Sequence, residues 1–248
     1  GSLITEPAAM TLAALMLGDL TLVTDLPQVL GLSAESLNGW QPRRPQAYRA
    51  GTRLVATGPL FARLDCPLPE ALQPFLDGSA PTALVVLSSS TPQMLRAVVR
   101  RVRAAGVRVI VGATIHDYGP NDDPGVVVAA LLPNHRVMPR VQLAVTMGGQ
   151  GSIQTAMASG TPVIGIPLHP EQELNVDLAA RHGAGLALAP RHVDSPRLTD
   201  AVQRLLAEPG FAAGAQRVRQ WYAAADGAGT AARAILDWLE ARSAPLHQ

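Results

Sequence analysis

The chain has 248 residues, of which 48% are hydrophobic, so it can build a substantial core. Only 16% are charged and the formal net charge is +1, which gives no electrostatic footprint for nucleic acid or an anionic membrane. The single cysteine, Cys66, excludes a disulfide within the chain and a multi-cysteine metal site, and no apolar run reaches the roughly 18 residues of a membrane span.

The first 53 residues differ in pattern from the rest of the chain. Gly1 and Ser2 are typical of the scar left by removal of an affinity tag. A strand is predicted at 20–24, followed by a connector rich in proline and glycine, and another strand at 53–57. We interpret residues 1–53 as the tag scar, the remnant of an N-terminal domain and a linker, and residues 54–248 as one further domain that ends in helices.

From residue 82 onwards, short apolar strands alternate with helices. The helix at 91–105 has the clearest boundaries, with Ser90 or Thr91 as N-cap, Pro92 at the first position and Gly106 after its end. A single helical turn is predicted at 135–140. The predicted strands are 82–87, 107–111, 125–130, 142–146, 162–166 and 185–189. The other predicted helices are 150–159, 171–182, 195–207, 210–224 and 229–241.

This alternation predicts an α/β fold. Continuously apolar strands indicate a parallel sheet that is covered on both faces, and right-handed crossovers then give a doubly wound, Rossmann-like domain. Ligands of such sheets bind at the C-terminal ends of the strands. We therefore expect the site among the loops that follow residues 87, 111, 146 and 166.

The loop after the strand at 142–146 is the most informative stretch of the sequence. It reads Thr146-Met147-Gly148-Gly149-Gln150-Gly151-Ser152 and runs directly into a predicted helix. Glycines allow close approach of a ligand, and a helix N-terminus offers free N–H groups and a partial positive charge, so the loop predicts a phosphate site. A plain tight turn would explain a single Gly-Gly pair. A dinucleotide site is a poor alternative, because its G-x-G-x-x-G motif follows the first strand of a domain.

A second polar element follows the next strand. Glu171, Gln172 and Asn175 offer a carboxylate and two amides, which are suited to hydrogen bonds with sugar hydroxyls. Glu171 alone could equally be an acidic residue favoured at the start of its helix. His169 with Glu171 does not make a metal site, and His116-Asp117 is better explained as a polar loop than as a catalytic dyad.

Four groups of residues form one combined motif in this half of the chain. They are 147–152, Ser159-Gly160-Thr161-Pro162, Pro167 with Glu171-Gln172, and Asn175. The combination resembles the donor-binding signature of UDP-glycosyltransferases of the GT-B fold, which include antibiotic, macrolide and plant secondary-metabolite enzymes. The similarity covers about residues 54–240, with Gly58-Pro59-Leu60 at the usual start of the C-terminal domain.

The resemblance implies that residues 54–248 are the nucleotide-sugar donor-binding half of a GT-B enzyme. The base would lie on a shelf formed by Leu131, Leu132 and Pro133, and Asn175 would brace the loop. Glu171 and Gln172 would hold the hexose. The diphosphate would be lined by Gly148, Gly149, Gly151 and Ser152, and Ser89 would approach it from the opposite loop. Met147 and Gln150, in the same loop, complete the nucleotide-sugar-binding residues.

Two side chains depart from the family pattern. Met147 stands where the family usually has a histidine that contacts the diphosphate, and packing is its more natural role. Thr155 stands where the family often has a glutamate for the ribose. Each missing contact is worth roughly 1.5–3 kcal/mol when well placed.

The resemblance also implies what lies outside this chain. In the family, the acceptor site and the catalytic base belong to an N-terminal domain, and no residue here is placed for the role of base. We expect a cytoplasmic fragment of an inverting glycosyltransferase, without metal or cofactor, whose co-substrate is a nucleoside-diphosphate sugar. Its partner is the N-terminal acceptor-binding domain, with no nucleic acid or membrane span, and a homodimer is left open. The alternatives are a degenerate auxiliary domain that stabilises a true transferase and, more weakly, a nucleotide-sugar epimerase.

Overall fold

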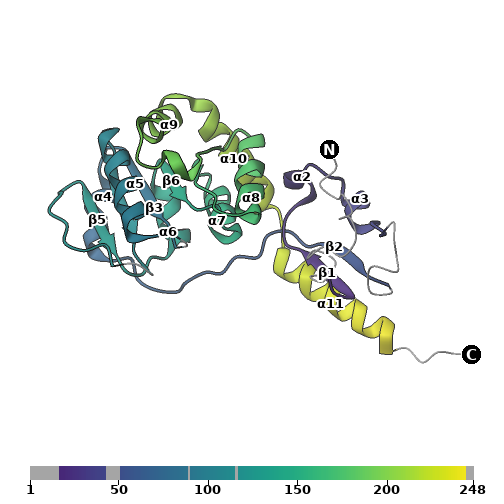
Figure 1. Cartoon of the computed structure of the whole chain (residues 1–248). Helices are drawn as coiled ribbons and strands as arrows, with labels where there is room; N and C mark the ends of the chain where they lie inside the picture. The colour runs from purple at the N-terminus through teal and green to yellow at the C-terminus, as the bar shows by residue number, and fades with distance from the viewer. Residues whose placement is uncertain (1–16, 43–50, 89, 115–116, 244–248) are drawn as a thin grey trace, which may run out of the picture. The chain divides into compact units, whose positions relative to one another are not determined.

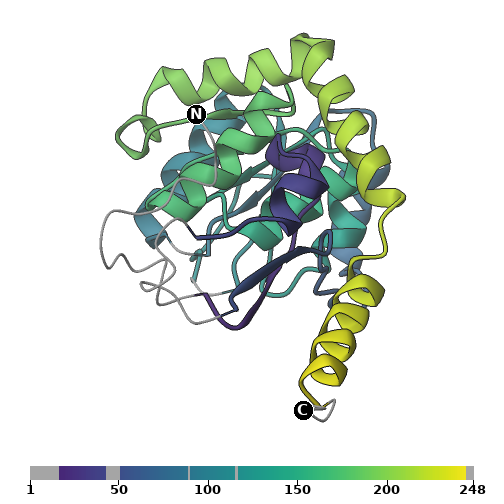
Figure 2. The same cartoon turned by 90° about the vertical axis from the view of Figure 1, so that its right-hand side faces the viewer.

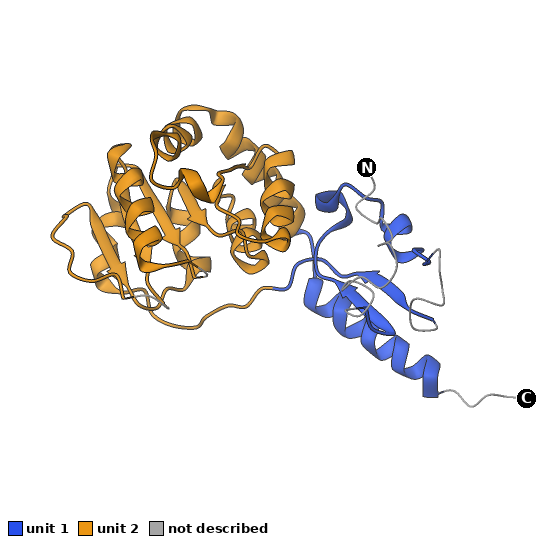
Figure 3. Cartoon of the chain, in the orientation of Figure 1, with its two compact units in different colours: residues 1–60, 224–248 blue, residues 61–223 orange. Residues whose placement is uncertain are grey.

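The computed structural model describes residues 17–42, 51–88, 90–114 and 117–243. The chain forms two compact units (Figure 3), one of residues 1–60 with 224–248 and the other of residues 61–223. We call them unit 1 and unit 2 and describe each by itself. The strand predicted at 53–57 falls in unit 1, and the interpretation of residues 1–53 as a domain remnant and linker stays a prediction.

Unit 2 is built on a six-stranded parallel sheet in the order β5-β4-β3-β6-β7-β8. The strands are β3 (Thr82–Val86), β4 (Arg108–Gly112), β5 (Val126–Ala129), β6 (Leu143–Thr146), β7 (Val163–Gly165) and β8 (Gly185–Ala187). Numbered within the unit, this is the order 3-2-1-4-5-6 of a doubly wound nucleotide-binding sheet. The predicted α/β, Rossmann-like fold is confirmed, with every predicted strand of this sheet present.

Helices cover both faces of this sheet (Figures 1 and 2). The sheet grows in opposite directions from β3 and β6, so right-handed crossovers place the helices after these strands on opposite faces. On one face, α5 (Pro92–Ala104) and α9 (Pro196–Ala207) pack over a core of alternate strand residues. The crossovers after β6 and β7 are α7 (Gln150–Ser159) and α8 (Pro170–Arg181), which contact each other.

The helix α5 begins and ends as its sequence predicts. The Thr91 hydroxyl accepts a hydrogen bond from the Met94 N–H at 3.2 Å, which identifies Thr91 as the N-cap. Gly106 closes the helix with φ of 80°. Two arginines of α5, Arg100 and Arg101, both pair with Asp194.

A later helix, α10 (Pro209–Ala223), ties α7 and α8 together at their C-terminal ends. Gln216 Nε2 donates to the Gly160 carbonyl at 3.4 Å, and Arg217 Nη2 donates to the His182 carbonyl at 2.7 Å. The last carbonyls of a helix lack partners within it, so these side chains satisfy groups that would otherwise depend on water.

Smaller elements complete unit 2. The predicted helical turn at 135–140 is present as α6 (Asn134–Val137) and the 3₁₀ turn η3 (Met138–Arg140). Three further short elements have no counterpart among the predictions: η2 (Glu70–Leu72), α4 (Gln73–Asp77) and η4 (Pro190–His192).

Unit 1 contains a parallel pair of strands, β1 (Leu20–Val23) and β2 (Arg53–Ala56), and the helix α11 (Gly227–Ser243), which contacts β1. The connector rich in proline and glycine after β1 contains two short helices that the sequence pattern does not predict. These are α2 (Pro27–Leu30) and α3 (Ala34–Asn38), which form because Pro27 occupies a first helical position and Ser33 caps α3 through the Ser36 N–H. No helix among the described residues is long and apolar enough to cross a membrane.

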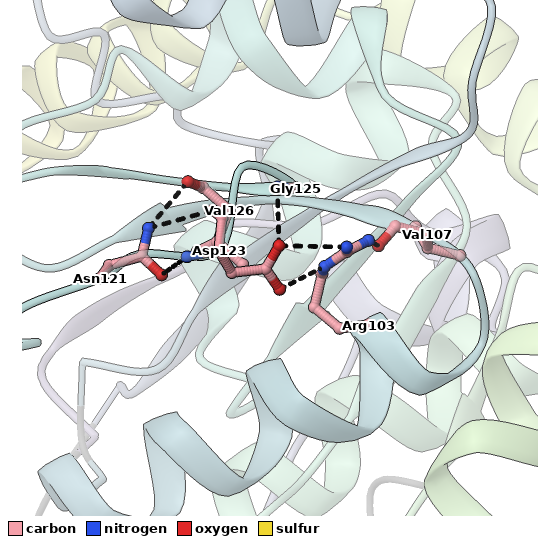
Figure 4. Close-up of polar contacts among 6 residues, drawn as sticks. All are labelled: Arg103, Val107, Asn121, Asp123, Gly125 and Val126. Carbon is pink, nitrogen blue, oxygen red and sulfur yellow. Dashed lines mark hydrogen bonds and ion pairs between the residues drawn. The ribbon is translucent and has the colours of Figure 1, made fainter.

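An ion pair fixes the loop before β5 to the end of α5 (Figure 4). Arg103 donates to both carboxylate oxygens of Asp123 at 2.9 and 3.2 Å, and to the Val107 carbonyl at 2.8 Å. The Gly125 N–H donates to Asp123 at 2.8 Å. These bonds, first from Arg103 and then from Gly125, lower the pKa of Asp123 below its ordinary 3.8.

We expect Asp123→Asn to lower the melting temperature by a few degrees at pH 7 and by progressively less below pH 4. A carboxylate with a depressed folded-state pKa stabilises the fold above its unfolded-state pKa of about 3.8, and that stabilisation is lost as the pH falls through the folded-state pKa. Thermal unfolding across this range checks the effect. Asp122→Asn removes the same charge from the exposed neighbouring residue and serves as the control. An equal loss in both variants would contradict a specific role for the Arg103 pair.

Candidate functional site

The predicted site lies where the sheet order reverses, between β3 and β6. The chain leaves these two strands toward opposite faces, which opens a crevice at their carboxyl ends in sheets of this kind. Ser89, predicted to approach from the β3 side, lies outside the described residues. Of its neighbours, Ser88 is exposed and the Ser90 hydroxyl donates to the Leu87 carbonyl at 2.7 Å.

The first glycine of the loop after β6 is required by the chain itself. Gly148 has φ of 89°, a conformation that side chains other than glycine rarely adopt. A Cβ here would lie 2.6 Å from Val176 Cγ2 and 2.9 Å from the Gln172 carbonyl oxygen. The Gly148 N–H donates to the Thr146 hydroxyl at 3.0 Å. Close packing of α8 against the loop therefore fixes glycine at this position.

The other two glycines are not required in this way. Gly149 is the N-cap of α7, with φ of −58° and ψ of 141°, which any residue can adopt. A Cβ on Gly149 or on Gly151 would meet no atom within 4 Å. The helix N-terminus also carries no side-chain cap, although serine or aspartate at Gly149 would supply one. The chain thus leaves open space at the start of α7.

Several hydrogen-bond donors lie at the start of α7. The N–H groups of Ser152 and Ile153 turn back to the Gly149 carbonyl at 3.0 and 3.1 Å. Neither the Gly151 N–H nor the Ser152 hydroxyl has a partner among the described residues. These free groups, together with the positive end of the helix dipole, can bind an anion.

The structure brings Glu171 to the same place from the start of α8. Its Oε1 accepts a hydrogen bond from the Gln150 N–H, the first of α7, at 3.2 Å. Asn175 Nδ2 lies 2.5 Å from the same oxygen and donates to the Gly148 carbonyl at 2.9 Å. The prediction that Asn175 braces the loop is confirmed. Sequence reasoning placed Glu171 on its own helix and missed its contact with α7.

Gln172 faces inward in the structure. Gln172 is only 3% exposed, and its Oε1 accepts a hydrogen bond from the Leu168 N–H at 2.8 Å. It therefore shapes the loop between β7 and α8. A hydrogen bond from Gln172 to a hexose hydroxyl would require its amide to turn outward.

The side chains that depart from the family pattern have structural roles. Met147 is 3% exposed and continues the inward alternation of Leu143 and Val145 into the core beneath α5 and α9. Its interpretation as a packing residue is confirmed. The Thr155 hydroxyl donates to the Gly151 carbonyl one turn earlier, at 2.6 Å. At the predicted base shelf, Leu132 is buried, whereas Leu131 is 49% exposed.

The remaining candidates from the sequence are His169, His116 and Asp117. His169 Nδ1 lies 3.9 Å from Glu171 Oε2, and the described residues contain no group of three His, Cys, Asp or Glu side chains suited to a metal ion. His116 lies outside the described residues, while Asp117 accepts from the Gly119 N–H at 2.9 Å.

A separate hollow of about 620 Å³ lies between α8 and the segment after β8. It is lined by Pro170, Glu173, Leu174 and Asp177, which form one face of α8, and by residues 187–191. Glu171 and Asn175 lie on the neighbouring face of the helix. None of the predicted site residues lines the hollow.

Known proteins with similar sequences and structures are glycosyltransferases. The chain is 36% identical to 4'-demethylrebeccamycin synthase of Lentzea aerocolonigenes over 102 aligned residues. The aligned region is 40% of this chain and 24% of that protein. Spinosyn forosaminyltransferase SpnP has a similar structure, with a TM-score of 0.68 at 18% identity over 90% of this chain and 55% of that one. The glycosyltransferase VinC, solved in complex with dTDP, has a TM-score of 0.59 at 20% identity over 75% and 51%.

The chain corresponds to only part of these relatives. The chain spans less than a third of the length of the first curated relatives it matches, and about half the length of the similar solved structures. The sequence model for the C-terminal domain of proteins like erythromycin biosynthesis protein CIII matches residues 107–233, just over half of this chain. The chain therefore belongs to the EryCIII-like C-terminal domain family of antibiotic-type GT-B glycosyltransferases.

Proposed function

We propose that this chain is the donor-binding half of an inverting glycosyltransferase. It binds a nucleoside-diphosphate sugar and serves transfer of a hexose or deoxyhexose to a hydroxyl group of a small hydrophobic acceptor. The start of α7 binds the diphosphate and stabilises the negative charge that develops on it as its bond to the anomeric carbon of the sugar breaks. Binding needs no metal or other cofactor. Relatives named for rebeccamycin and spinosyn chemistry support the class of product.

The observation that carries this proposal is the open start of α7 at the reversal of the sheet. Gly149 and Gly151 are free of any steric requirement from the chain, and the Gly151 N–H and Ser152 hydroxyl are available as donors. A chain that needed this loop only as a turn would gain stability from a capping side chain at Gly149. A ligand that approaches the backbone closely explains glycine at both positions.

The sugar and the base would occupy the two sides of the diphosphate. Glu171, half exposed at the start of α8, can accept hydrogen bonds from hexose hydroxyls. The exposed Leu131 offers an apolar surface to the base, and backbone groups of Leu132 and Pro133 would read its edge. A complex of VinC with dTDP supports a nucleoside diphosphate as the ligand class.

Catalysis requires a partner domain that binds the acceptor and supplies the base. Unit 1 supports this view, because its described part holds only two parallel strands, whereas parallel sheets are normally larger and covered on both faces. The helix α11 also exposes Ile235, Leu236 and Leu239 by 41%, 57% and 47%. We infer that an N-terminal acceptor-binding domain covers this face, and that the chain alone binds nucleotide without turnover.

Gly151→Asp separates ligand binding from folding. Aspartate in the first turn of a helix stabilises it by about 0.3–1 kcal/mol, so the melting temperature should hold or rise. The same carboxylate repels a diphosphate, so binding of UDP or dTDP should weaken at least tenfold. Isothermal titration and thermal unfolding measure the two effects. Gly151→Ala is the neutral control, with folding intact and a smaller loss of affinity.

Two results would contradict the proposed function. One is the absence of binding by the unmodified chain to UDP, dTDP and their glucose esters. The other is transfer of sugar to an acceptor by this chain alone, which would disprove the need for a partner domain.

A non-catalytic auxiliary role is the second candidate, and the burial of Met147 favours it. The position that usually supplies a hydrogen-bonding side chain in the family here belongs to the core. If the chain binds no nucleotide but Met147→His creates binding, a degenerate donor site is indicated. If the unmodified chain binds and histidine adds nothing, the donor-domain function holds.

A further inference from the structure

The carboxylate of Glu171 occupies part of the anion site at the start of α7. Glu171 Oε1 accepts from the Gln150 N–H at 3.2 Å, and Asn175 holds the same oxygen while it donates to the Gly148 carbonyl. A carboxylate at a helix N-terminus is stabilised by the helix dipole, as a phosphate would be. The contact therefore joins the residue proposed to bind sugar to the groups proposed to bind diphosphate.

We propose that Glu171 is a specificity-determining residue that opposes binding of sugar-free diphosphates and favours nucleotide sugars. This inference rests on the proposed function of the site. A diphosphate must take the Gln150 N–H away from Glu171, and the two negative charges then repel each other at short range. A bound hexose offers hydroxyl groups that replace the lost hydrogen bond to Glu171, whereas UDP and dTDP carry no hexose and so place no such hydroxyl groups beyond the diphosphate.

The geometry allows such an exchange. The Glu171 side chain is 54% exposed, so it can swing away from α7 without unpacking the core. Asn175 has a second anchor at the Gly148 carbonyl and can remain in place while Glu171 moves. Since water also reaches Glu171, the effect on affinity should be moderate, about five- to tenfold in either direction for each ligand class.

The test compares Glu171→Gln with Glu173→Gln in the full chain. Glu173 lies one residue beyond Gln172 in the same first turn of α8, is exposed, and has no hydrogen bond to α7 among the described residues, so its replacement removes the same charge without touching the contact. Isothermal titration measures binding of UDP, dTDP, UDP-glucose and dTDP-glucose. Glu171→Ala repeats the measurement without an amide oxygen to accept from Gln150, and thermal unfolding confirms that each variant is folded.

We expect only the Glu171 variants to shift binding preference from nucleotide sugars toward the sugar-free diphosphates. Glu171→Gln should bind UDP and dTDP five- to tenfold more tightly than the unmodified chain, and their glucose esters several-fold more weakly, while Glu173→Gln changes neither by more than twofold. Unchanged affinity for UDP and dTDP in both Glu171 variants overturns the inference, as does an equal gain in Glu173→Gln. Both of those results leave the proposed function intact. Binding of no nucleotide by any variant overturns the proposed function itself, and the exchange with it.

Discussion

Gly148→Ala is expected to destabilise the protein by about 3 kcal/mol, whereas Gly149→Ala, one residue further along, should leave stability almost unchanged. The two positions share one loop and one residue type. They differ in backbone conformation and in what surrounds them. The comparison therefore isolates the steric demand of the fold from the demand of a ligand.

The cost at Gly148 has two parts. A left-handed backbone conformation, here φ of 89°, costs a residue with a Cβ about 1–2 kcal/mol. The new methyl group would also meet the Gln172 carbonyl oxygen and Val176 Cγ2 at 2.9 and 2.6 Å, and forced contacts of this kind cost about 1–3 kcal/mol. At Gly149 neither term applies, because φ is −58° and no atom lies within 4 Å of an added Cβ.

Urea unfolding measures the stability of both variants, and isothermal titration with dTDP measures binding. Gly149→Ala should remain as stable as the unmodified chain yet bind more weakly, because its methyl group enters the space left for the ligand. Gly148→Ala should lose both properties. Equal stability of the two variants would show that α8 can move away from the loop, contrary to the packing seen here. Unchanged binding by Gly149→Ala would place the ligand elsewhere.

The regular part of the fold was predictable because its local signals agree. Thr91, Pro92 and Gly106 bound α5, and the apolar runs at 82–87 and 142–146 are typical of buried parallel strands. The short helices α2 and α3 escape prediction because Pro27, Gly31 and Gly39 are residues that usually interrupt helices. In the structure Pro27 begins a helix, and Gly31 and Gly39 end them.

The site was predictable in outline and not in its contacts. The motif 147–152 correctly marks a loop that runs into a helix at the reversal of the sheet. The motif cannot separate Gly148 from Gly149, because the difference arises from Val176 and Gln172 on a helix that comes later in the chain. The Glu171 contact with Gln150 likewise depends on how α8 packs beside α7.

Met147 is different, because a local signal for its burial was present. Leu143, Val145 and Met147 alternate with period two, so extension of the strand pattern by one step points the methionine inward. The family resemblance, by contrast, marks this position only by its missing histidine. A histidine at this position would carry a polar ring into an apolar core, so Met147→His tests stability as much as binding.

Gly214→Ala is the second large effect, expected to destabilise the protein by about 3 kcal/mol, while Gly210→Ala in the same helix should stabilise it by a few tenths of a kcal/mol. An added Cβ at Gly214 would lie 2.4 Å from the Gly183 carbonyl oxygen and 2.5 Å from that of His182. These are backbone atoms that cannot rotate away. At Gly210 nothing lies within 4 Å, so alanine there only improves helix propensity.

Thermal and urea unfolding of the two variants should therefore shift in opposite directions. If Gly214→Ala is tolerated, α10 can separate from the C-terminal end of α8, and the bond from Arg217 to the His182 carbonyl is dispensable. Arg217→Ala can be made both in the unmodified chain and in Gly214→Ala. An equal loss of stability in the two backgrounds would show that the two contacts act independently.

Nucleotide binding by Gly214→Ala distinguishes support of the fold from control of the site. Gly214 contacts the end of α8 that lies about 16 Å from Glu171, at 1.5 Å per residue along the helix. Destabilisation at this distance reduces the fraction of molecules that are folded, so the apparent Kd should rise on warming in inverse proportion to the folded fraction, while Kd should match that of the unmodified chain where the variant is fully folded. A changed Kd at a temperature where the variant is fully folded would mean that α8 moves as a rigid body and displaces Glu171 from α7. In that case α10 would set the geometry of the proposed donor site as well as the stability of the sheet.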